Sequence, residues 1–235
     1  MSETFIYPGE ELVLFQHAAH WKKYFSNTIK PYIKGNVLEV GAGIGATTLL
    51  LNDGSAPQWL MLEPDEKMNA LLKTKLETKE LPANCLLQTG TIDQLHAGFD
   101  TIIYIDVLEH IEADALEVNQ SARMLHAGGH IIVLCPAFQF LYNPFDKAIG
   151  HHRRYNKKMI RGLKPGGLEL ISNRYYDTAG YFAALMNKLF LRQKYPTHKQ
   201  VMFWDRWLVP VSKISDNIFF HSFGKCIIAI WKKIN

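Results

Sequence analysis

One short segment carries acid and base side chains close together. Asp106, Glu109 and His110 fall within the five residues DVLEH, directly after an apolar run. Imidazole has an ordinary pKa near neutrality, so His110 could act as a general base for a bound acceptor, with Glu109 beside it. The simpler interpretation is that Glu109 supports the next helix and His110 packs. This segment is the first candidate for a catalytic centre.

A second polar cluster, GHHRRY at residues 150–155, places two histidines and two arginines in succession. Such groups bind carboxylates, phosphates or acidic sugars, so we expect His151 to join the catalytic centre and its neighbours to bind the acceptor. The alternative is a solvated helix start whose charges pair internally. The predicted acceptor-binding residues are His152, Arg154, Tyr155 and Tyr142, with Asp146 as a further candidate.

Three glycines, Gly41, Gly43 and Gly45, follow the apolar run from Val37. Glycine lets a backbone approach a ligand closely, and the start of the following helix favours negative charge. The ligand would be the methionine carboxylate of S-adenosylmethionine (SAM) or the pyrophosphate of a dinucleotide, whose looser fingerprint the segment also fits. The G-x-G-x-G spacing and the acid Glu39, two places before the first glycine, favour SAM.

Glu63 ends the next apolar run, in the sequence MLEPD. A carboxylate at the end of a second strand can accept hydrogen bonds from both hydroxyls of a ribose. An exposed loop glutamate is the plain alternative. Because Glu63 follows the glycine loop at the spacing expected of a nucleotide site, we interpret it as a ribose ligand.

These candidate side chains can act together only if strands and helices bring them to the same edge of a sheet. Apolar runs alternate with helical patterns, which predicts an α/β fold with a parallel sheet covered on both faces, the doubly wound arrangement. The expected strands are Asn36–Gly41, Trp59–Glu63, Cys85–Gln88, Phe99–Asp106, His130–Cys135, Leu168–Tyr176 and Lys225–Trp231. The expected helices are Tyr7–Ile33, Ile44–Leu51, Asp65–Thr78 with Asp65 as its cap, and Asp114–Leu125 closed by Gly128 and Gly129.

We predict a single domain over residues 1–235 that begins with a helical segment, 1–35. Two longer segments of this domain lie outside the alternation of strands and helices. Residues 136–154 have no clean period and predict a lid loop. Residues 178–223 predict a helical, aromatic insertion before the last strand. We expect its aromatic side chains to be core, with a substrate wall or a homodimer surface as alternatives, and Asp205 to pair with Arg206. The aromatic side chains are Phe182, Phe190, Phe203, Trp204, Trp207, Phe219 and Phe220.

Composition excludes several classes of protein. The chain has 235 residues, 48% of them hydrophobic, with 26 basic and 22 acidic side chains for a net charge of +4. This balance is ordinary for a globular protein and too weak to indicate a nucleic-acid partner. The cysteines Cys85, Cys135 and Cys226 are far apart and predict buried thiols. No secretory pattern or membrane-spanning apolar run occurs, so we expect a cytoplasmic protein.

The chain resembles the class I SAM-dependent methyltransferases over nearly its whole length. The resemblance is carried by Val37–Gly45, Leu62–Asp65, Gly90–Leu95 and Phe99–Ile111 (FDTIIYIDVLEHI), with Gly128–Gly129 and the GHHRRY cluster. It implies a Rossmann-like sheet of seven strands, mostly parallel, with the last strand antiparallel. It also implies SAM as the cofactor and S-adenosylhomocysteine as its product.

The resemblance assigns each part of the cofactor to a segment. The methionine end would lie on Glu39, Gly41, Ala42 and Gly43, with Asp106 and Val107 beside it, the ribose on Glu63 and Pro64, and the adenine at Thr91 and Ile92. Many relatives place an aspartate directly after the glycine of the adenine loop. Here Thr91 follows Gly90 and the acid is Asp93, so either side chain could meet the adenine amine.

A narrower resemblance concerns metal. An acid-x-x-Glu-His segment joined by a later histidine is similar to the divalent-metal site of small-RNA 2′-O-methyltransferases and of ubiquinone-pathway O-methyltransferases. It implies a second possibility, that Asp106, Glu109, His110 and His151 (or His152) hold a cation that acidifies a substrate hydroxyl.

The predicted function is methyl transfer from SAM to a small molecule, by O-methylation of a hydroxyl. The first alternative is an RNA or other metal-dependent 2′-O-type methyltransferase. The chain shows no appended basic segment, which argues against this alternative. The others are an NAD-dependent reductase or epimerase, for which a Tyr-x-x-x-Lys pair is missing, and a non-catalytic SAM-binding protein.

Overall fold

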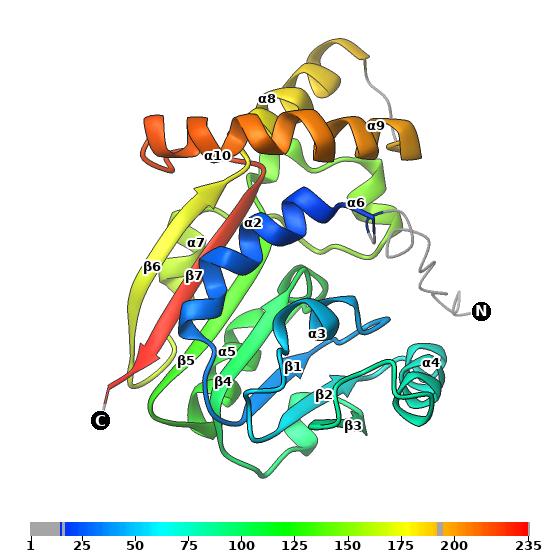
Figure 1. Ribbon diagram of the computed structural model, residues 1–235. Coiled ribbons are helices and arrows are strands. Elements are labelled where there is room, and N and C mark those ends of the chain that lie inside the picture. Colours follow the sequence, from blue (N-terminus) through cyan, green and yellow to red (C-terminus); the bar gives the residue numbers. More distant parts are fainter. Residues whose placement is uncertain (1–14, 16, 192–194, 235) are drawn as a thin grey trace, which may run out of the picture.

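The computed structural model describes residues 15, 17–191 and 195–234, and these form a seven-stranded sheet covered by helices (Figure 1). The strand order is β3-β2-β1-β4-β5-β7-β6, and β7 runs antiparallel to both of its neighbours. The strands are β1 Val37–Val40, β2 Trp59–Glu63, β3 Cys85–Thr89, β4 Phe99–Ile105, β5 Leu125–Pro136, β6 Leu168–Tyr176 and β7 Cys226–Lys233. This is the doubly wound, mostly parallel sheet that was predicted, with its last strand reversed.

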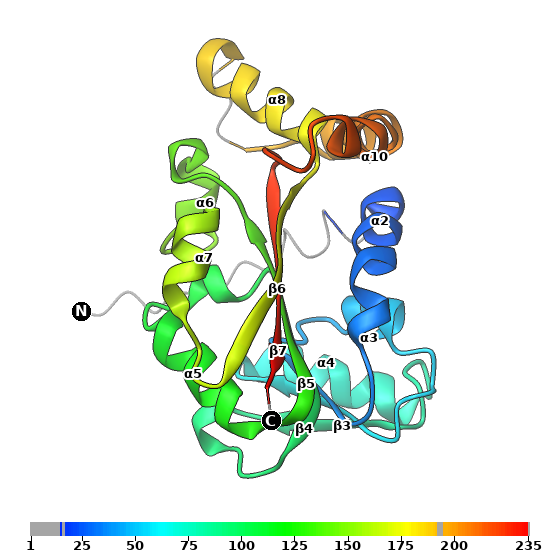
Figure 2. The same cartoon turned by 90° about the vertical axis from the view of Figure 1, so that its left-hand side faces the viewer.

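Both faces of the sheet are buried. Every residue of β1 and β2 is buried, as expected for parallel strands covered on both sides. Figure 2 shows α5 (Asp114–Met124), α6 (Pro144–Ala148) and α7 (Lys157–Leu163) on one side of the sheet. The other side carries α2 (Ala19–Ile29), α3 (Ala46–Leu51) and α10 (Val209–Ile218). Two separate apolar cores result, one on each face.

The local signals for helix ends were mostly correct. The Asp65 carboxylate accepts hydrogen bonds from the backbone N–H groups of Lys67 and Met68, which caps α4 (Glu66–Glu77) as predicted. Helix α5 ends at Met124, so Gly128 does not close it and lies within β5 instead. At the amino end, α2 is followed by a 3₁₀ turn, Lys30–Tyr32, and the predicted helical residues 7–14 lie outside the described residues.

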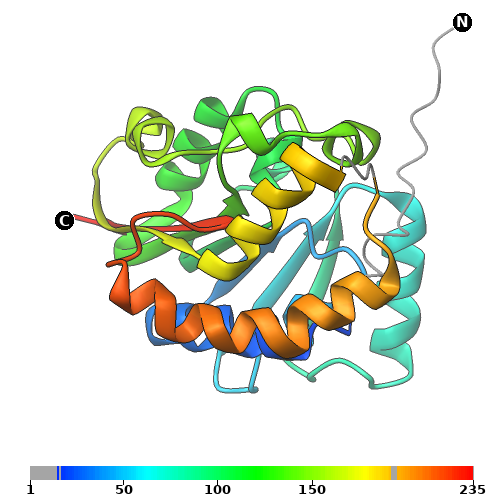
Figure 3. The ribbon, with the colours of Figure 1, turned by 90° about the horizontal axis from the view of Figure 1, so that it is seen from above.

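The predicted lid loop is partly regular structure. A 3₁₀ turn, Gln139–Leu141, precedes α6, and the Asn143 side chain caps α6 from its amino end. The insertion after β6 is helical, as predicted. It consists of α8 (Thr178–Met186), a π-helical turn (Asn187–Leu191), α9 (His198–Phe203), a second π-helical turn (Trp204–Leu208) and α10. Seen from above, α8 and the α9–α10 rod form the upper layer of the molecule (Figure 3).

Two predictions about the insertion are wrong. Of the seven aromatic residues expected in the core, Trp204 is buried, whereas Phe182, Phe190, Phe203, Trp207, Phe219 and Phe220 are exposed. The helices form a single layer, and in the described part of the chain nothing covers their outer side. Asp205 does not pair with Arg206, whose guanidinium lies 5.6 Å from the Trp207 ring centroid. Instead Asp205 accepts hydrogen bonds from the backbone N–H groups of His20 and Trp21 at the start of α2.

The three cysteines are buried free thiols, as predicted. Among the described helices, none is both long and apolar enough to cross a bilayer.

Candidate active site

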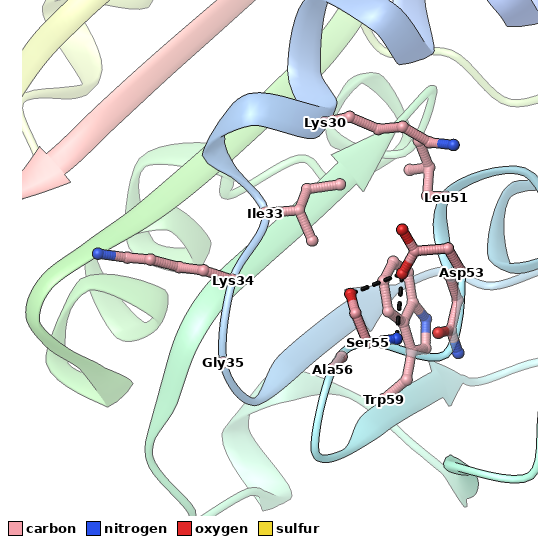
Figure 4. A pocket seen from close by; sticks show the side chains of 10 residues that line it. Lys30, Ile33, Lys34, Gly35, Leu51, Asp53, Ser55, Ala56 and Trp59 are labelled. Carbon is pink, nitrogen blue, oxygen red and sulfur yellow. Dashed lines mark hydrogen bonds between the residues drawn. The ribbon is translucent and has the colours of Figure 1, made fainter.

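A large cavity lies at the carboxyl edge of the parallel strands. Its volume is about 1510 Å³, and its walls come from the glycine loop, the segment after β4, residues 143–154 and the helical insertion. Single-ligand pockets usually measure roughly 300–1,000 Å³, so there is room for a cofactor and an acceptor together. A small hollow of about 90 Å³ lies at the opposite edge, where Ser55 donates hydrogen bonds to the Asp53 carboxylate (Figure 4). The large cavity is therefore the candidate site.

The glycine loop forms one wall of this cavity because its backbone takes a conformation that favours glycine. Gly41, Gly43 and Gly45 have φ angles of +69°, +56° and +78°. A Cβ on Gly41 would lie 2.6 Å from Cγ2 of Val107, so the loop packs directly on the segment after β4. Gly41, Ala42, Gly43 and Val107 all line the cavity, as predicted for the methionine end.

Glu63 lines the same cavity at the end of β2. Its Oε2 accepts the Gly43 N–H at 2.7 Å, and its Oε1 accepts the Asp65 N–H at 3.0 Å. Burial raises the pKa of this carboxyl above its ordinary value. Each carboxylate oxygen retains a lone pair for a further donor, so Glu63 both fixes the glycine loop and can receive a ligand hydroxyl. Pro64 lines the cavity beside it.

Glu39 does not lie where the resemblance implied. Its side chain is buried and does not line the cavity. Its Oε2 accepts hydrogen bonds from the Thr48 hydroxyl at 2.6 Å and the Trp59 indole at 2.7 Å. Burial is the main cause that raises its pKa to about 7. The pleat explains the difference, because successive residues of β1 point to opposite faces and Glu39 faces the α3 side.

At the end of β3, Gly90, Thr91 and Ile92 line the cavity, as predicted for the adenine end. Asp93 is not among the lining residues. The Thr91 hydroxyl donates a hydrogen bond to the Asp93 carboxylate, so the two candidate side chains hold each other. The structure thus brings Thr91, and not Asp93, to the wall.

Asp106 follows β4 with a φ of +54°, a strained conformation for a residue with a side chain. Its carboxylate opens into the cavity. The surrounding protein raises its pKa to about 6, while His151 and Lys225 act in the opposite direction. This strain places a carboxylate at the point where the glycine loop and the catalytic segment meet.

Glu109, His110 and His151 come together at the cavity, and one ligand atom of each lies within 4.8 Å of the others. Glu109 is fully buried, and neither carboxyl oxygen has a hydrogen-bond partner among the described residues. Burial, and then the Asp106 charge, raise its pKa well above the ordinary value. The His110 and His151 rings meet edge to face with centroids 4.6 Å apart. Burial and the His151 charge lower the pKa of His110 to about 4. Asp106 is not part of this three-residue group.

His151 is held mainly by Asp146, which the sequence offered only as a further candidate. Its Nδ1 lies 2.9 Å from Oδ1 of Asp146, and its Nε2 lies 3.7 Å from Oε1 of Glu109. Asp146 is buried and also receives two hydrogen bonds from the Arg154 guanidinium, at 2.9 and 2.8 Å. The Asn143–Asp146 capping box, NPFD in the sequence, is the signal that could have revealed Asp146.

The predicted acceptor-binding set therefore needs correction. Arg154 is buried in its ion pair with Asp146, so its charge is already satisfied. Tyr155 is fully buried and does not line the cavity; its hydroxyl lies 2.7 Å from Oδ2 of Asp114 and 3.1 Å from the Leu108 carbonyl oxygen, and its one proton serves these two acceptors. The hydroxyl of Tyr142 donates to the His151 carbonyl at 2.6 Å. Of the four predicted residues, His152 and Arg154 line the cavity, and His152 is the one with an exposed side chain there.

Comparison with known proteins gave a family match over part of the chain and several structures with the same fold. Residues 37–129 match the model of a family described as a methyltransferase domain. Comparison with curated sequences gave no significant match. Three solved structures share the fold. One is a chain described as a methyltransferase, in complex with the Haloferax volcanii activator Trm112 (13% identity, 97% of this chain and 95% of that chain, TM-score 0.65). The second is an S-adenosylmethionine-dependent methyltransferase from Mesorhizobium loti (14%, 93% and 100%, 0.61). The third is the magnesium protoporphyrin IX methyltransferase of Synechocystis with bound SAH (15%, 96% and 83%, 0.55).

Proposed function

We propose that this chain is a class I SAM-dependent methyltransferase and that it methylates a hydroxyl group of a small-molecule acceptor bound between His151 and the helical insertion. The observation that carries the proposal is the Asp146–His151 pair, which directs an imidazole into a cavity large enough for two ligands. The cofactor would occupy the half formed by Gly41–Gly43, Glu63, Thr91 and Asp106, and the acceptor the other half.

Methyl transfer to oxygen requires an aligned nucleophile and the removal of one proton. With its proton on Nδ1, His151 would donate a hydrogen bond to the Asp146 carboxylate, which leaves Nε2 to accept the proton of the acceptor hydroxyl. The Asp146 carboxylate would then stabilise the imidazolium that forms, as in other acid–histidine pairs. Arg154 holds Asp146 in place. His110 is a poor base, because its pKa of about 4 gives it little affinity for a proton at neutral pH.

A second candidate is metal-assisted methyl transfer, which one observation favours. Glu109 is a fully buried carboxyl without a hydrogen-bond partner among the described residues, and burying such a group is costly. A divalent cation held by Glu109, His110 and His151 would satisfy it, and the Asp146–His151 bond is the usual outer support of a histidine ligand. Such an ion would lower the pKa of the acceptor hydroxyl.

The base assignment is tested with a panel of phenols, hydroxy acids and sugars, in which S-adenosylhomocysteine release and the methylated product are detected by mass spectrometry. His151→Ala should lose turnover while it keeps SAM affinity. Substitution of the exposed His96 by alanine is the matched control. A product methylated on nitrogen or carbon, or normal turnover by His151→Ala, would refute the proposal.

Glu109→Gln separates the two candidates. Without a metal, burial raises the pKa of Glu109 well above its ordinary value and favours the neutral carboxyl, so the amide is a close replacement and turnover should persist. With a metal, the variant should lose Mn²⁺ binding to the free protein, measured by calorimetry, and chelator should abolish wild-type turnover. Full wild-type activity in chelator, together with an active Glu109→Gln variant, would eliminate the metal site.

A further inference from the structure

The rod formed by α9, the following π-helical turn and α10 presents an apolar side to solvent. Trp207, Val211, Ile214 and Ile218 are each between 52% and 67% exposed, whereas the exposed Phe203 at the end of α9 lines the cavity. The spacing of three and four residues places these four along one side of the rod, which we call the outer stripe. Exposed large apolar side chains in a continuous row are unusual on a monomer surface and indicate a contact surface.

The buried side of the same rod adds Val201, Trp204 and Val209 to the core, and the polar groups buried beside them are all engaged. Asp205 binds the amino end of α2, and Asp216 accepts the N–H groups of Asp177 and Thr178. Ser212 donates to the Asp177 carboxylate. The rod is therefore anchored by hydrogen bonds, and its apolar stripe is not a misplaced core face.

The charges of the insertion have one sign on its surface. Residues 178–223 contain two acidic side chains, Asp205 and Asp216, and both are buried. The six basic side chains are Lys188, Arg192, Lys194, Lys199, Arg206 and Lys213. Among the described ones, Lys188, Lys199 and Arg206 are exposed, with Lys199 at the cavity, and Lys213 is half-buried with its ammonium over the Tyr24 ring of α2. Bulky apolar groups flanked by cations, without exposed anions, match the surface of a bilayer that contains anionic lipids.

We propose that the outer stripe docks this protein on an anionic lipid surface, with the α9–α10 rod lying in the bilayer interface. A second copy of the chain fits the stripe less well, because the exposed charges of the insertion are all positive and an isologous contact would bring like charges together. Gln200 and Leu208 of the same rod line the cavity, so docking would set the acceptor side of the cavity near the bilayer. The proposal does not depend on the identity of the methyl acceptor.

Cosedimentation of the full chain with vesicles tests this directly. The protein should bind vesicles of phosphatidylcholine with about 30% phosphatidylglycerol, bind pure phosphatidylcholine more weakly, and dissociate as salt is raised. The double variant Ile214→Asp/Ile218→Asp should bind about tenfold more weakly or worse, since two apolar contacts are lost and two negative charges are added. Leu116→Asp on α5, 58% exposed in the wild type, is the matched control and should bind normally.

Thermal unfolding of each variant shows whether the fold is kept, and all three positions are exposed. Absence of wild-type binding to the anionic vesicles would overturn the proposal, as would equal loss of binding in Leu116→Asp. A dimer in analytical ultracentrifugation that Ile214→Asp/Ile218→Asp dissociates, without vesicle binding by either protein, would show instead that the stripe joins two copies.

Discussion

Replacing Glu39 by glutamine tests whether this carboxyl is structural or contacts the cofactor. In the structure it accepts hydrogen bonds from Thr48 and Trp59 beneath the glycine loop. A glutamine carbonyl oxygen at the same place can accept both bonds. We therefore expect Glu39→Gln to fold normally and to bind SAM with wild-type affinity.

The size of the stability effect follows from the pKa. Folding raises the pKa of Glu39 from 4.5 to about 7, so the folded state binds more protons than the unfolded state between these values. The contribution of Glu39 to stability is therefore fully present below pH 4.5 and is lost as pH rises through 7. At about 1.36 kcal/mol per pH unit, the loss amounts to about 3 kcal/mol. Glutamine has no such proton to lose.

The assay is urea unfolding of wild type and Glu39→Gln at several pH values between 5 and 8, without cofactor. The free energy of unfolding of the variant, relative to wild type, should rise with pH, with most of the 3 kcal/mol gained within this range. Other titrating groups are common to both proteins and cancel in the difference. A difference that stays constant with pH would refute the reasoning about burial. A tenfold or greater loss of SAM affinity would show that Glu39 reaches the cofactor.

Gly41→Ala should eliminate measurable SAM binding in calorimetry, because φ is +69° and the added Cβ would meet a side-chain carbon at 2.6 Å. Gly54→Ala is the control, because Gly54 also has a positive φ, +84°, but has open space around it. Retained SAM affinity in Gly41→Ala would contradict the tight packing of the loop. Glu63→Gln should weaken SAM binding by about 1.5–3 kcal/mol, the range for hydrogen bonds to a charged group, and an unchanged dissociation constant would exclude its role at the ribose. Arg154→Ala should lower the free energy of unfolding by about 3–5 kcal/mol, since it removes the fixed positive charge that pairs with the buried Asp146 carboxylate. Unchanged urea unfolding would show that this ion pair is not structural.

The sequence alone predicted the sheet and the cofactor half of the cavity. Apolar runs, the cap at Asp65 and the glycine turn after β1 act over a few neighbouring residues, so their patterns can be read locally. Alternation of strands and helices then brings the ends of β1, β2 and β4 to one edge, because parallel strands share a direction. The positions of Glu63 and Asp106 at the cavity follow from this rule.

Tertiary structure decided which side chains are left to act on a substrate. Asp146, Arg154 and His151 form their hydrogen-bonded group through the fold of residues 143–154, and this turned a predicted anion-binding arginine into a support for a histidine. The sequence also did not reveal which side of the α9–α10 rod is buried, because Asp205 of this rod binds the start of α2, 185 residues away in the chain. Which side of a helix is buried depends on the partner it meets, and that partner is chosen by contacts far apart in the chain.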